Sequence, residues 1–178
     1  MKSTQSLRLK GTVASDSLGL VADWTHALSE NADLAEVLKR LMLLVKADSC
    51  MITRTSRPNN KTQYIVRCDS QEGKIWPTQN RSCAELIVGD FMFSAKVGSI
   101  WKLSEALSSQ LSVEANGLHA KPNHIVESIV SPLELTRTFV DHIELQFKHR
   151  PAEHDLNLLI MLMGTLGAGW ARRAPGLV

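Results

Sequence analysis

The chain has 178 residues, and its 20 Lys and Arg against 18 Asp and Glu give a formal net charge of +2. Apolar residues make up 44% and charged residues 21% of the chain, which excludes both a disordered tail and a supercharged binder. The near balance of charge also excludes a protein that holds nucleic acid by phosphate contacts alone. The length suits one domain, or one domain with short extensions.

The composition and the local hydropathy predict a cytoplasmic protein with no membrane partner. Residues 1–6 lead into a polar run without an apolar h-region, so no signal peptide is expected. The most apolar stretch, Leu156–Trp170, is shorter than the ~20 residues of a bilayer span and favours a buried helix. The three cysteines Cys50, Cys68 and Cys83 lack CxxC spacing, which argues against a metal knuckle and against a disulfide framework. We therefore expect no metal and no cofactor.

A flexible leader is expected over residues 1–14, followed by two helices. Residues 15–17 can cap the first helix, whose apolar side chains share one face. Asp33 and Glu36 form a capping-box-like start for the second helix, in which Asp33 accepts backbone N–H groups and Glu36 reaches back. The apolar stripe of that helix predicts an end near Lys46.

A β-hairpin is predicted after the second helix, because the hydrophobic period changes from Asp48 onward. Ser49–Thr55 and Thr62–Cys68 are the two predicted strands, and the Pro and Asn residues between them favour a turn. The middle of the chain is more irregular, and only a brief strand is predicted there, over Ser99–Leu103.

A second hairpin is predicted from two extended runs, Ile125–Leu135 and Phe139–Phe147. Pro132 cannot donate to a strand ladder, so its strand is either an edge there or carries a bulge. Asp141 falls on the apolar side of the last strand, or alternatively marks the end of the turn. The side chains of that strand alternate between an apolar face (Phe139, Ile143, Leu145 and Phe147) and a more polar face (His142, Glu144 and Gln146).

A terminal helix is predicted over about Ala152–Arg172. Its two glycines Gly164 and Gly167 permit close backbone approach, and Pro175 follows its end. Hairpins flanked by helices predict an α+β fold with an antiparallel sheet and helices packed on it, and exclude a doubly wound fold.

Two segments resemble a GAF-type sensor domain: LAEVLKRLMLLVKADSCMITR (Leu34–Arg54) and IVESIVSPLELTRTFVDHIELQF (Ile125–Phe147). The tail GWARRAPGLV (Gly169–Val178) is similar to the end of the sensor half of a LuxR-type bacterial transcription regulator. The resemblance implies N- and C-terminal helices on one face of an antiparallel sheet and a small-molecule pocket under loops on the other face. It implies a sensor domain over residues 15–174 and the start of a linker over 175–178.

The resemblance also implies partners. A small-molecule effector of unknown identity is expected, together with a homodimer formed through the terminal helices. DNA would be bound only through a helix-turn-helix domain outside this chain. The expected function is therefore ligand sensing and dimerisation in a bacterial transcriptional regulator, without enzymatic activity.

Five residues are candidate ligand-binding residues. Trp76 and Trp101 stand in the irregular middle, where an indole can offer a wide face and one donor to a ligand, or simply pack on the sheet. The resemblance places the loop of His119 near the pocket mouth. Arg54 and Arg67 can lie near each other across the first hairpin and hold an anionic ligand, although solvated strand arginines are commoner.

The cysteines leave one enzymatic alternative open, a thiol-based GAF-type reductase of free methionine sulfoxide. Cys50 and Cys68 can approach across the first hairpin, but such chemistry needs an exposed thiolate of low pKa. A buried structural role is favoured, because free cysteine is usually a small buried hydrophobe. No GxxxxGK[ST], GxGxxG, GxSxG or HExxH motif occurs in the chain, so a nucleotide hydrolase, a dinucleotide enzyme or a zinc protease lacks motif support.

Overall fold

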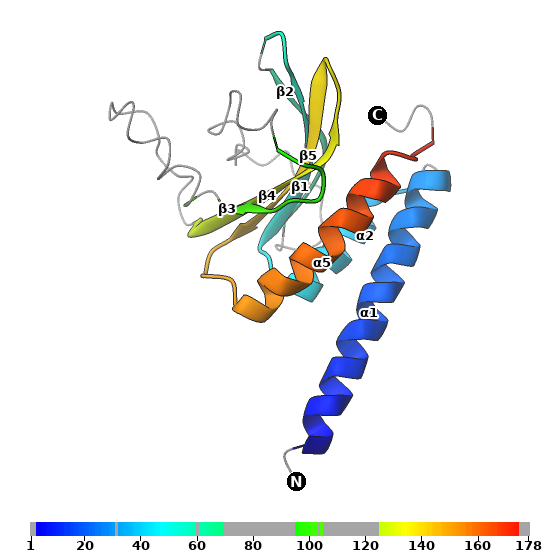
Figure 1. The fold of residues 1–178 in the computed structure, drawn as a ribbon, viewed down its shortest axis with the longest axis vertical. Helices are drawn as coiled ribbons and strands as arrows, with labels where there is room; N and C mark the ends of the chain where they lie inside the picture. The colour runs from blue at the N-terminus through cyan, green and yellow to red at the C-terminus, as the bar shows by residue number, and fades with distance from the viewer. Residues whose placement is uncertain are drawn as a thin grey trace.

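The computed structural model describes residues 3–30, 32–59, 61–69, 95–102, 104 and 125–174, with the side chains of the first helix described from residue 15. Within these ranges the fold is α+β, as predicted: helices lie on one face of an antiparallel sheet (Figure 1). The elements are α1 (Ser3–Glu30), α2 (Leu34–Val45), β1 (Ser49–Ser56), β2 (Thr62–Asp69), β3 (Trp101–Lys102), β4 (Glu127–Leu135), β5 (Phe139–Phe147) and α5 (Glu153–Trp170).

The sheet has the order β2-β1-β5-β4-β3, and every described pairing is antiparallel. Both predicted hairpins are present, and β5 has the predicted bounds. The register of β4 against β5 shifts between Pro132 and Glu134, so of the two predicted alternatives, an edge or a bulge, the bulge is present. The two hairpins join through β1 and β5, which places β5 at the centre of the sheet.

Helix α2 begins as predicted, but its capping box is incomplete. The Asp33 side chain accepts a hydrogen bond of 2.8 Å from the backbone N–H of Ala35. Glu36 does not reach back toward Asp33, because its carboxylate pairs with Lys39. The helix ends at Val45, and the C-cap residue Lys46 has the left-handed φ of 57° and donates its N–H to the carbonyl of Met42.

Helix α1 is longer than predicted. It begins at Ser3, so Ser15 lies inside the helix and does not cap it. The helix thus occupies most of the segment expected to be a flexible leader. The physical reason is that no proline interrupts residues 3–14, and extending an existing helix is far cheaper than nucleating one.

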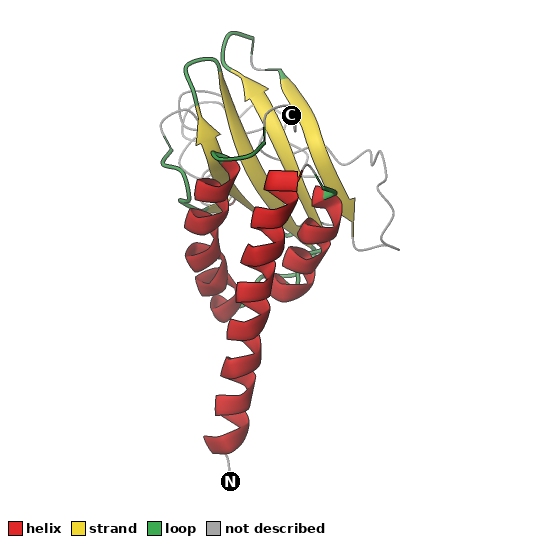
Figure 2. Cartoon of the chain, turned by 90° about the vertical axis from the view of Figure 1, so that its right-hand side faces the viewer, coloured by secondary structure: helices red, strands yellow, loops and turns green. Residues whose placement is uncertain are grey.

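The helices form two layers over the sheet. Helix α2 contacts β1 and β2, α5 contacts β4, and α1 contacts both α2 and α5 from outside (Figures 1 and 2). The N-terminal part of α1 projects beyond the rest of the fold (Figure 2). None of the described helices is long and apolar enough to cross a membrane.

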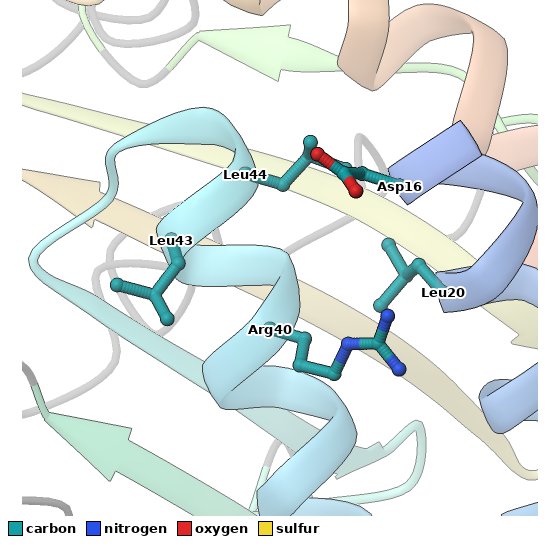
Figure 3. A pocket seen from close by; sticks show the side chains of 5 residues that line it. All are labelled: Asp16, Leu20, Arg40, Leu43 and Leu44. Carbon is teal, nitrogen blue, oxygen red and sulfur yellow. The ribbon is translucent and has the colours of Figure 1, made fainter. Parts of the chain in front are cut away.

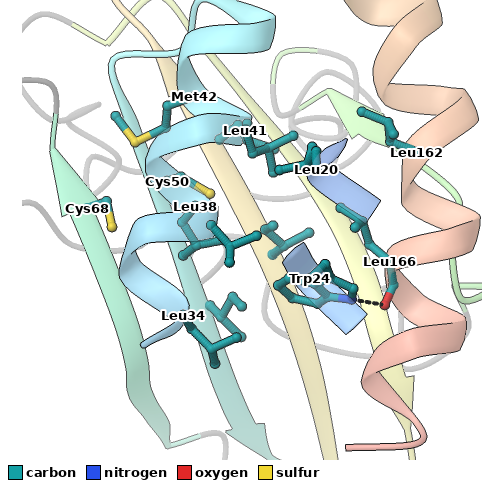
Figure 4. Packing of buried hydrophobic residues seen from close by; sticks show 14 of the residues in the cluster. Leu20, Trp24, Leu34, Leu38, Leu41, Met42, Cys50, Cys68, Leu162 and Leu166 are labelled. Carbon is teal, nitrogen blue, oxygen red and sulfur yellow. Dashed lines mark hydrogen bonds between the residues drawn. The ribbon is translucent and has the colours of Figure 1, made fainter. Parts of the chain in front are cut away.

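The two helical layers are joined by a pair of buried tryptophans. The rings of Trp24 on α1 and Trp170 on α5 stack with their centroids 5.8 Å apart, and both side chains are almost fully buried. The indole N–H of Trp24 donates to the carbonyl of Leu166 at 3.0 Å (Figure 4). Because each indole is buried with its donor satisfied, the pair anchors α1 and α5 to each other.

The predicted close approach at the glycines of α5 is confirmed for Gly167, whereas the Cβ position of Gly164 is open. Gly98 has a φ of +79° and donates its N–H to the carbonyl of Pro132 at 3.0 Å. A Cβ on Gly98 would lie 2.7 Å from the Cα of Gly164, and a Cβ on Gly167 would lie 2.6 Å from Cγ1 of Val97. The segment before β3 therefore packs directly on the α5 backbone.

We expect Gly98→Ala to lower the free energy of unfolding by about 2 kcal/mol, because the new Cβ meets backbone and the positive φ is unfavourable for alanine. Gly164→Ala is the matched control. A Cβ there meets nothing within 4 Å, so we expect a gain of about 0.5–1 kcal/mol from helix propensity. Urea unfolding of the two variants checks both values, and equal effects would contradict the close approach.

Candidate functional site

The face of the sheet turned away from the helices carries buried polar side chains, which we call the polar face. No helix in the described part of the chain lies on it. The side chains alternate along β5, so the predicted polar set His142, Glu144 and Gln146 is confirmed on one face, opposite the apolar core. The polar face comprises Ser49, Thr53 and Thr55 from β1, Ser128 from β4, and His142, Glu144 and Gln146 from β5, all of them buried.

A cross-strand row runs through the polar face from one edge of the sheet to the other. The register aligns Arg67, Met51, Glu144, Val130 and Trp101 on β2, β1, β5, β4 and β3. Four steps between neighbouring strands place the two ends of this row roughly 19 Å apart. Two of the predicted ligand-binding residues, Arg67 and Trp101, thus share a face with Glu144 but lie far from each other.

Glu144 is the centre of a hydrogen-bonded network on the polar face. The hydroxyl of Ser128 and the side-chain amide of Gln146 each donate to Oε1 of Glu144 at 2.8 Å. The hydroxyl of Ser49 donates to Oε1 of Gln146 at 2.9 Å. These bonds compensate for the desolvation of a carboxylate that is 0% exposed, and they orient it within the site.

His142 pairs with Thr53 next to this network. Its Nε2 lies 2.5 Å from Oγ1 of Thr53, and the residue is 1% exposed. Burial lowers the pKa of His142 to about 4, although the nearby carboxylates of Glu144 and Asp141 act in the opposite direction. The imidazole is therefore neutral at pH 7.

The second ring nitrogen of His142, Nδ1, has no hydrogen-bond partner among the described residues. A buried polar atom without a partner costs about 1–3 kcal/mol, so this nitrogen is suited to a group that arrives from outside the chain. A neutral imidazole can donate with one nitrogen and accept with the other, which lets it bind a hydroxyl, amide or carbonyl group.

The structure does not bring Arg54 and Arg67 together. Arg54 pairs with Gln63 in the hairpin register and Arg67 pairs with Met51, so the two arginines lie on opposite faces of the sheet. The expectation that they approach each other is therefore wrong. Met51, the cross-strand partner of Arg67, lies three residues before Arg54 on β1, and side chains an odd number of residues apart on a strand point to opposite faces. Arg54 binds Asp141 on the helix side of the sheet.

Of the other four predicted site residues, Arg67 and Trp101 are described and each contacts a neighbouring side chain. Arg67 packs its guanidinium 3.9 Å from the ring centroid of Tyr64. Trp101 donates its indole N–H to the hydroxyl of Ser99 at 3.0 Å. Trp76 and His119 lie outside the described residues, so their roles stay predictions.

Sequence reasoning placed three polar side chains on one face of β5 but did not select them as site residues. The alternation of polar and apolar residues does not reveal whether the polar face is buried, since a solvent-exposed strand face shows the same alternation. Thr53, Ser49 and Ser128 gave no signal of their own, because their importance comes from cross-strand pairing with β5.

The two described cysteines face the helices. Cys50 and Cys68 are direct cross-strand partners, both are buried, and the thiol of Cys68 donates to the carbonyl of Ala35 at 3.2 Å. Burial raises the pKa of Cys50 well above its usual value and that of Cys68 to about 11. Neither thiol offers the thiolate that a reductase needs. Cys83 lies outside the described residues.

A cleft of about 380 Å³ opens between α1 and α2 (Figure 3). Arg40 at its edge forms an ion pair with Asp23, and Leu43 is 80% exposed. This cleft lacks the convergent buried polar groups that orient a small ligand, so the polar face is the stronger candidate. Among the described residues, no group of three or more His, Cys, Asp or Glu could hold a metal ion.

Solved structures with a similar fold include an LBD domain and a GAF domain. The VqsR LBD domain from Pseudomonas aeruginosa aligns with a TM-score of 0.59 and 13% identity, over 89% of this chain and 96% of that one. The GAF domain of an Acinetobacter phosphoenolpyruvate-protein phosphotransferase aligns with a TM-score of 0.52 and 14% identity, over 97% and 95%. The chain therefore has a GAF-like fold. No protein-family model and no curated protein sequence matches it.

His142 should make stability depend on pH. Its pKa is about 4 when folded and about 6.5 when unfolded, so between these values the unfolded chain binds more protons. We expect the contribution of neutral His142 to be complete above pH 6.5 and to fall by about 3 kcal/mol as the pH drops to 4. His142→Gln should flatten the profile of unfolding free energy against pH relative to wild type.

The control for this measurement is His26→Gln, because His26 is exposed on α1. Urea unfolding at several pH values should give this variant the wild-type slope. A His142→Gln slope equal to that of wild type would show that His142 does not remain neutral in the folded chain.

Proposed function

We propose that the chain is the ligand-sensing and dimerisation domain of a bacterial transcriptional regulator of LuxR type, which binds a small molecule against the polar face. The observation that carries this proposal is the unpartnered Nδ1 of His142, a neutral and buried imidazole on the face away from the helices. Binding sites for small molecules commonly combine apolar walls with a few such convergent polar groups.

The chemistry around His142 supports recognition of a small polar molecule. The apolar residues Met51, Val130 and Val140 are buried on the same side of the sheet, beside the hydrogen-bonded carboxylate of Glu144. This mixture of apolar surface and fixed polar atoms favours a ligand that both buries carbon surface and forms a few oriented hydrogen bonds. One of the structural neighbours is itself named as an LBD, a ligand-binding domain.

The helix layers support the dimerisation part of the proposal. Large apolar side chains remain exposed on each described helix: Leu18 on α1 is 73% exposed, Leu43 on α2 is 80% exposed, and Met161 on α5 is 76% exposed. A projecting helix such as the N-terminal part of α1 gains stability from packing against another surface. We propose that a second copy supplies this surface, and that DNA is contacted by a domain outside this chain.

A thermal-shift screen of a metabolite library tests the ligand. A binding compound should raise the melting temperature, with a stabilisation of about 2.7 kcal/mol at a hundredfold excess over Kd. His142→Phe removes the imidazole nitrogens and should abolish the shift, whereas Leu43→Ala in the α1–α2 cleft should preserve it. A shift that survives His142→Phe but is lost in Leu43→Ala would place the ligand in the cleft and contradict the proposal.

Light scattering with mass determination tests the dimer. We expect the wild-type chain to have the mass of a dimer at high concentration, and Leu18→Asp to shift it toward the monomer, because a buried unpaired charge opposes association. The control Lys39→Asp changes charge on α2 at an already polar position. A wild-type chain that stays monomeric at high concentration would overturn this part of the proposal.

A further inference from the structure

Behind the polar face, on the helix side of the sheet, lies a buried carboxylate that binds two other elements. Asp141 on β5 is 0% exposed and accepts two hydrogen bonds from Arg54 on β1, one from Nε at 2.7 Å and one from Nη2 at 2.8 Å. It also accepts a hydrogen bond of 2.9 Å from the indole N–H of Trp170 on α5. A bidentate arginine pair and an indole donor fix this carboxylate in one orientation.

Arg173, just after α5, extends the same cluster. It donates from Nη1 to Glu134 at 2.6 Å and to the carbonyl of Trp170 at 2.9 Å, and its Nη2 lies 3.6 Å from Asp141. The next residue, Ala174, donates its backbone N–H to the carbonyl of Leu28 at the end of α1. We call Arg54, Asp141, Trp170 and Arg173 the Asp141 clamp. It connects the chain that leaves α5 with strands β1, β4 and β5.

The clamp and the candidate site lie on successive residues of the same two strands. The register pairs Thr53 with His142 and then Arg54 with Asp141. Consecutive side chains of a strand point to opposite faces, so the first pair lies on the polar face and the second pair lies against the helices. The strands lie only about 4.8 Å apart here, and a displacement of one pair has to move its neighbour.

Stability alone does not require such a cluster. Buried ion pairs are often matched or exceeded in stability by apolar residues of similar volume, because desolvation offsets much of the attraction. The directional bonds of Asp141 instead specify the position of the end of α5 relative to β1 and β5. A fixed position of the end of α5 relative to β1 and β5 allows a movement of the strands to displace the helix end as well.

We propose that the Asp141 clamp transmits changes at the Thr53–His142 pair to the C-terminal end of α5 and the segment that follows it. This proposal rests on the proposed function, because it assigns the route by which a molecule at the polar face alters the chain after α5. A ligand that binds His142 shifts the relative position of β1 and β5, which changes the bonds of Asp141 to Trp170. Regulation then follows from unequal ligand affinity for the two arrangements.

The test uses the full chain without any ligand. Thr53→Val keeps the shape of the side chain but removes the hydroxyl that contacts His142. We expect it to shift the indole N–H resonance of Trp170, assigned by comparison with Trp170→Phe. We also expect amide hydrogen exchange over residues 171–174 to accelerate about fivefold or more. Asp141→Asn, which weakens the clamp itself, should give the same acceleration.

Ser49→Ala is the matched control, because Ser49 also lies on the polar face but pairs with Gln146, away from Asp141. It should leave the Trp170 resonance and the exchange over 171–174 unchanged. If Thr53→Val is too unstable to study, His142→Gln perturbs the same pair from β5. The proposal would be overturned if Thr53→Val and His142→Gln left amide hydrogen exchange over residues 171–174 unchanged. It would also be overturned if Ser49→Ala accelerated that exchange as much as they do.

These outcomes are separable from those of the proposed function. Coupling between Thr53 and Trp170 without any metabolite that binds would reject ligand sensing and retain the clamp. Binding that depends on His142 without this coupling would reject the clamp and retain ligand sensing.

Discussion

Strand β5 is buried on both of its faces, and this constraint determines much of the structure around it. From Val140 to Phe147 each side chain of the strand is almost completely excluded from solvent. The face with Ile143, Leu145 and Phe147 satisfies this condition with hydrocarbon and holds the helical layers. The face with His142, Glu144 and Gln146 cannot do so, and each of its polar groups needs a partner supplied by another strand or from outside the chain.

The two faces of β5 therefore combine a hydrophobic core with a candidate binding surface in one element. The network from Ser49 through Gln146 to Glu144 is internally bonded, whereas the Nδ1 atom of His142 lacks a partner among the described residues. On the other face, Asp141 interrupts the apolar pattern and is bonded by two elements. His142 and Asp141 are adjacent residues on β5. For this reason we connect ligand binding at His142 with a conformational change at Asp141.

Much of the architecture could be predicted from local pattern because its causes are local. The apolar stripe and the Asp33 cap define α2, the alternation of side chains defines β5, and Pro132 restricts its strand to an edge or a bulge. Gly167 of α5 also indicates a close approach from the sequence alone, and the structure identifies Val97 and Gly98 as its neighbours. The start of α1 could not be predicted in this way, since a capping residue at Ser15 does not prevent a helix from continuing through it.

The sequence by itself determined the α+β class, the two hairpins and the polar alternation of β5, because each depends on residues close together in the chain. Only the tertiary structure decided which face each arginine of the first hairpin occupies, and that Arg54 is bound by Asp141. Tertiary structure also decided that the polar face is buried and that His142 is neutral there. Burial and cross-strand register depend on residues far apart in the chain, so no local pattern could reveal them.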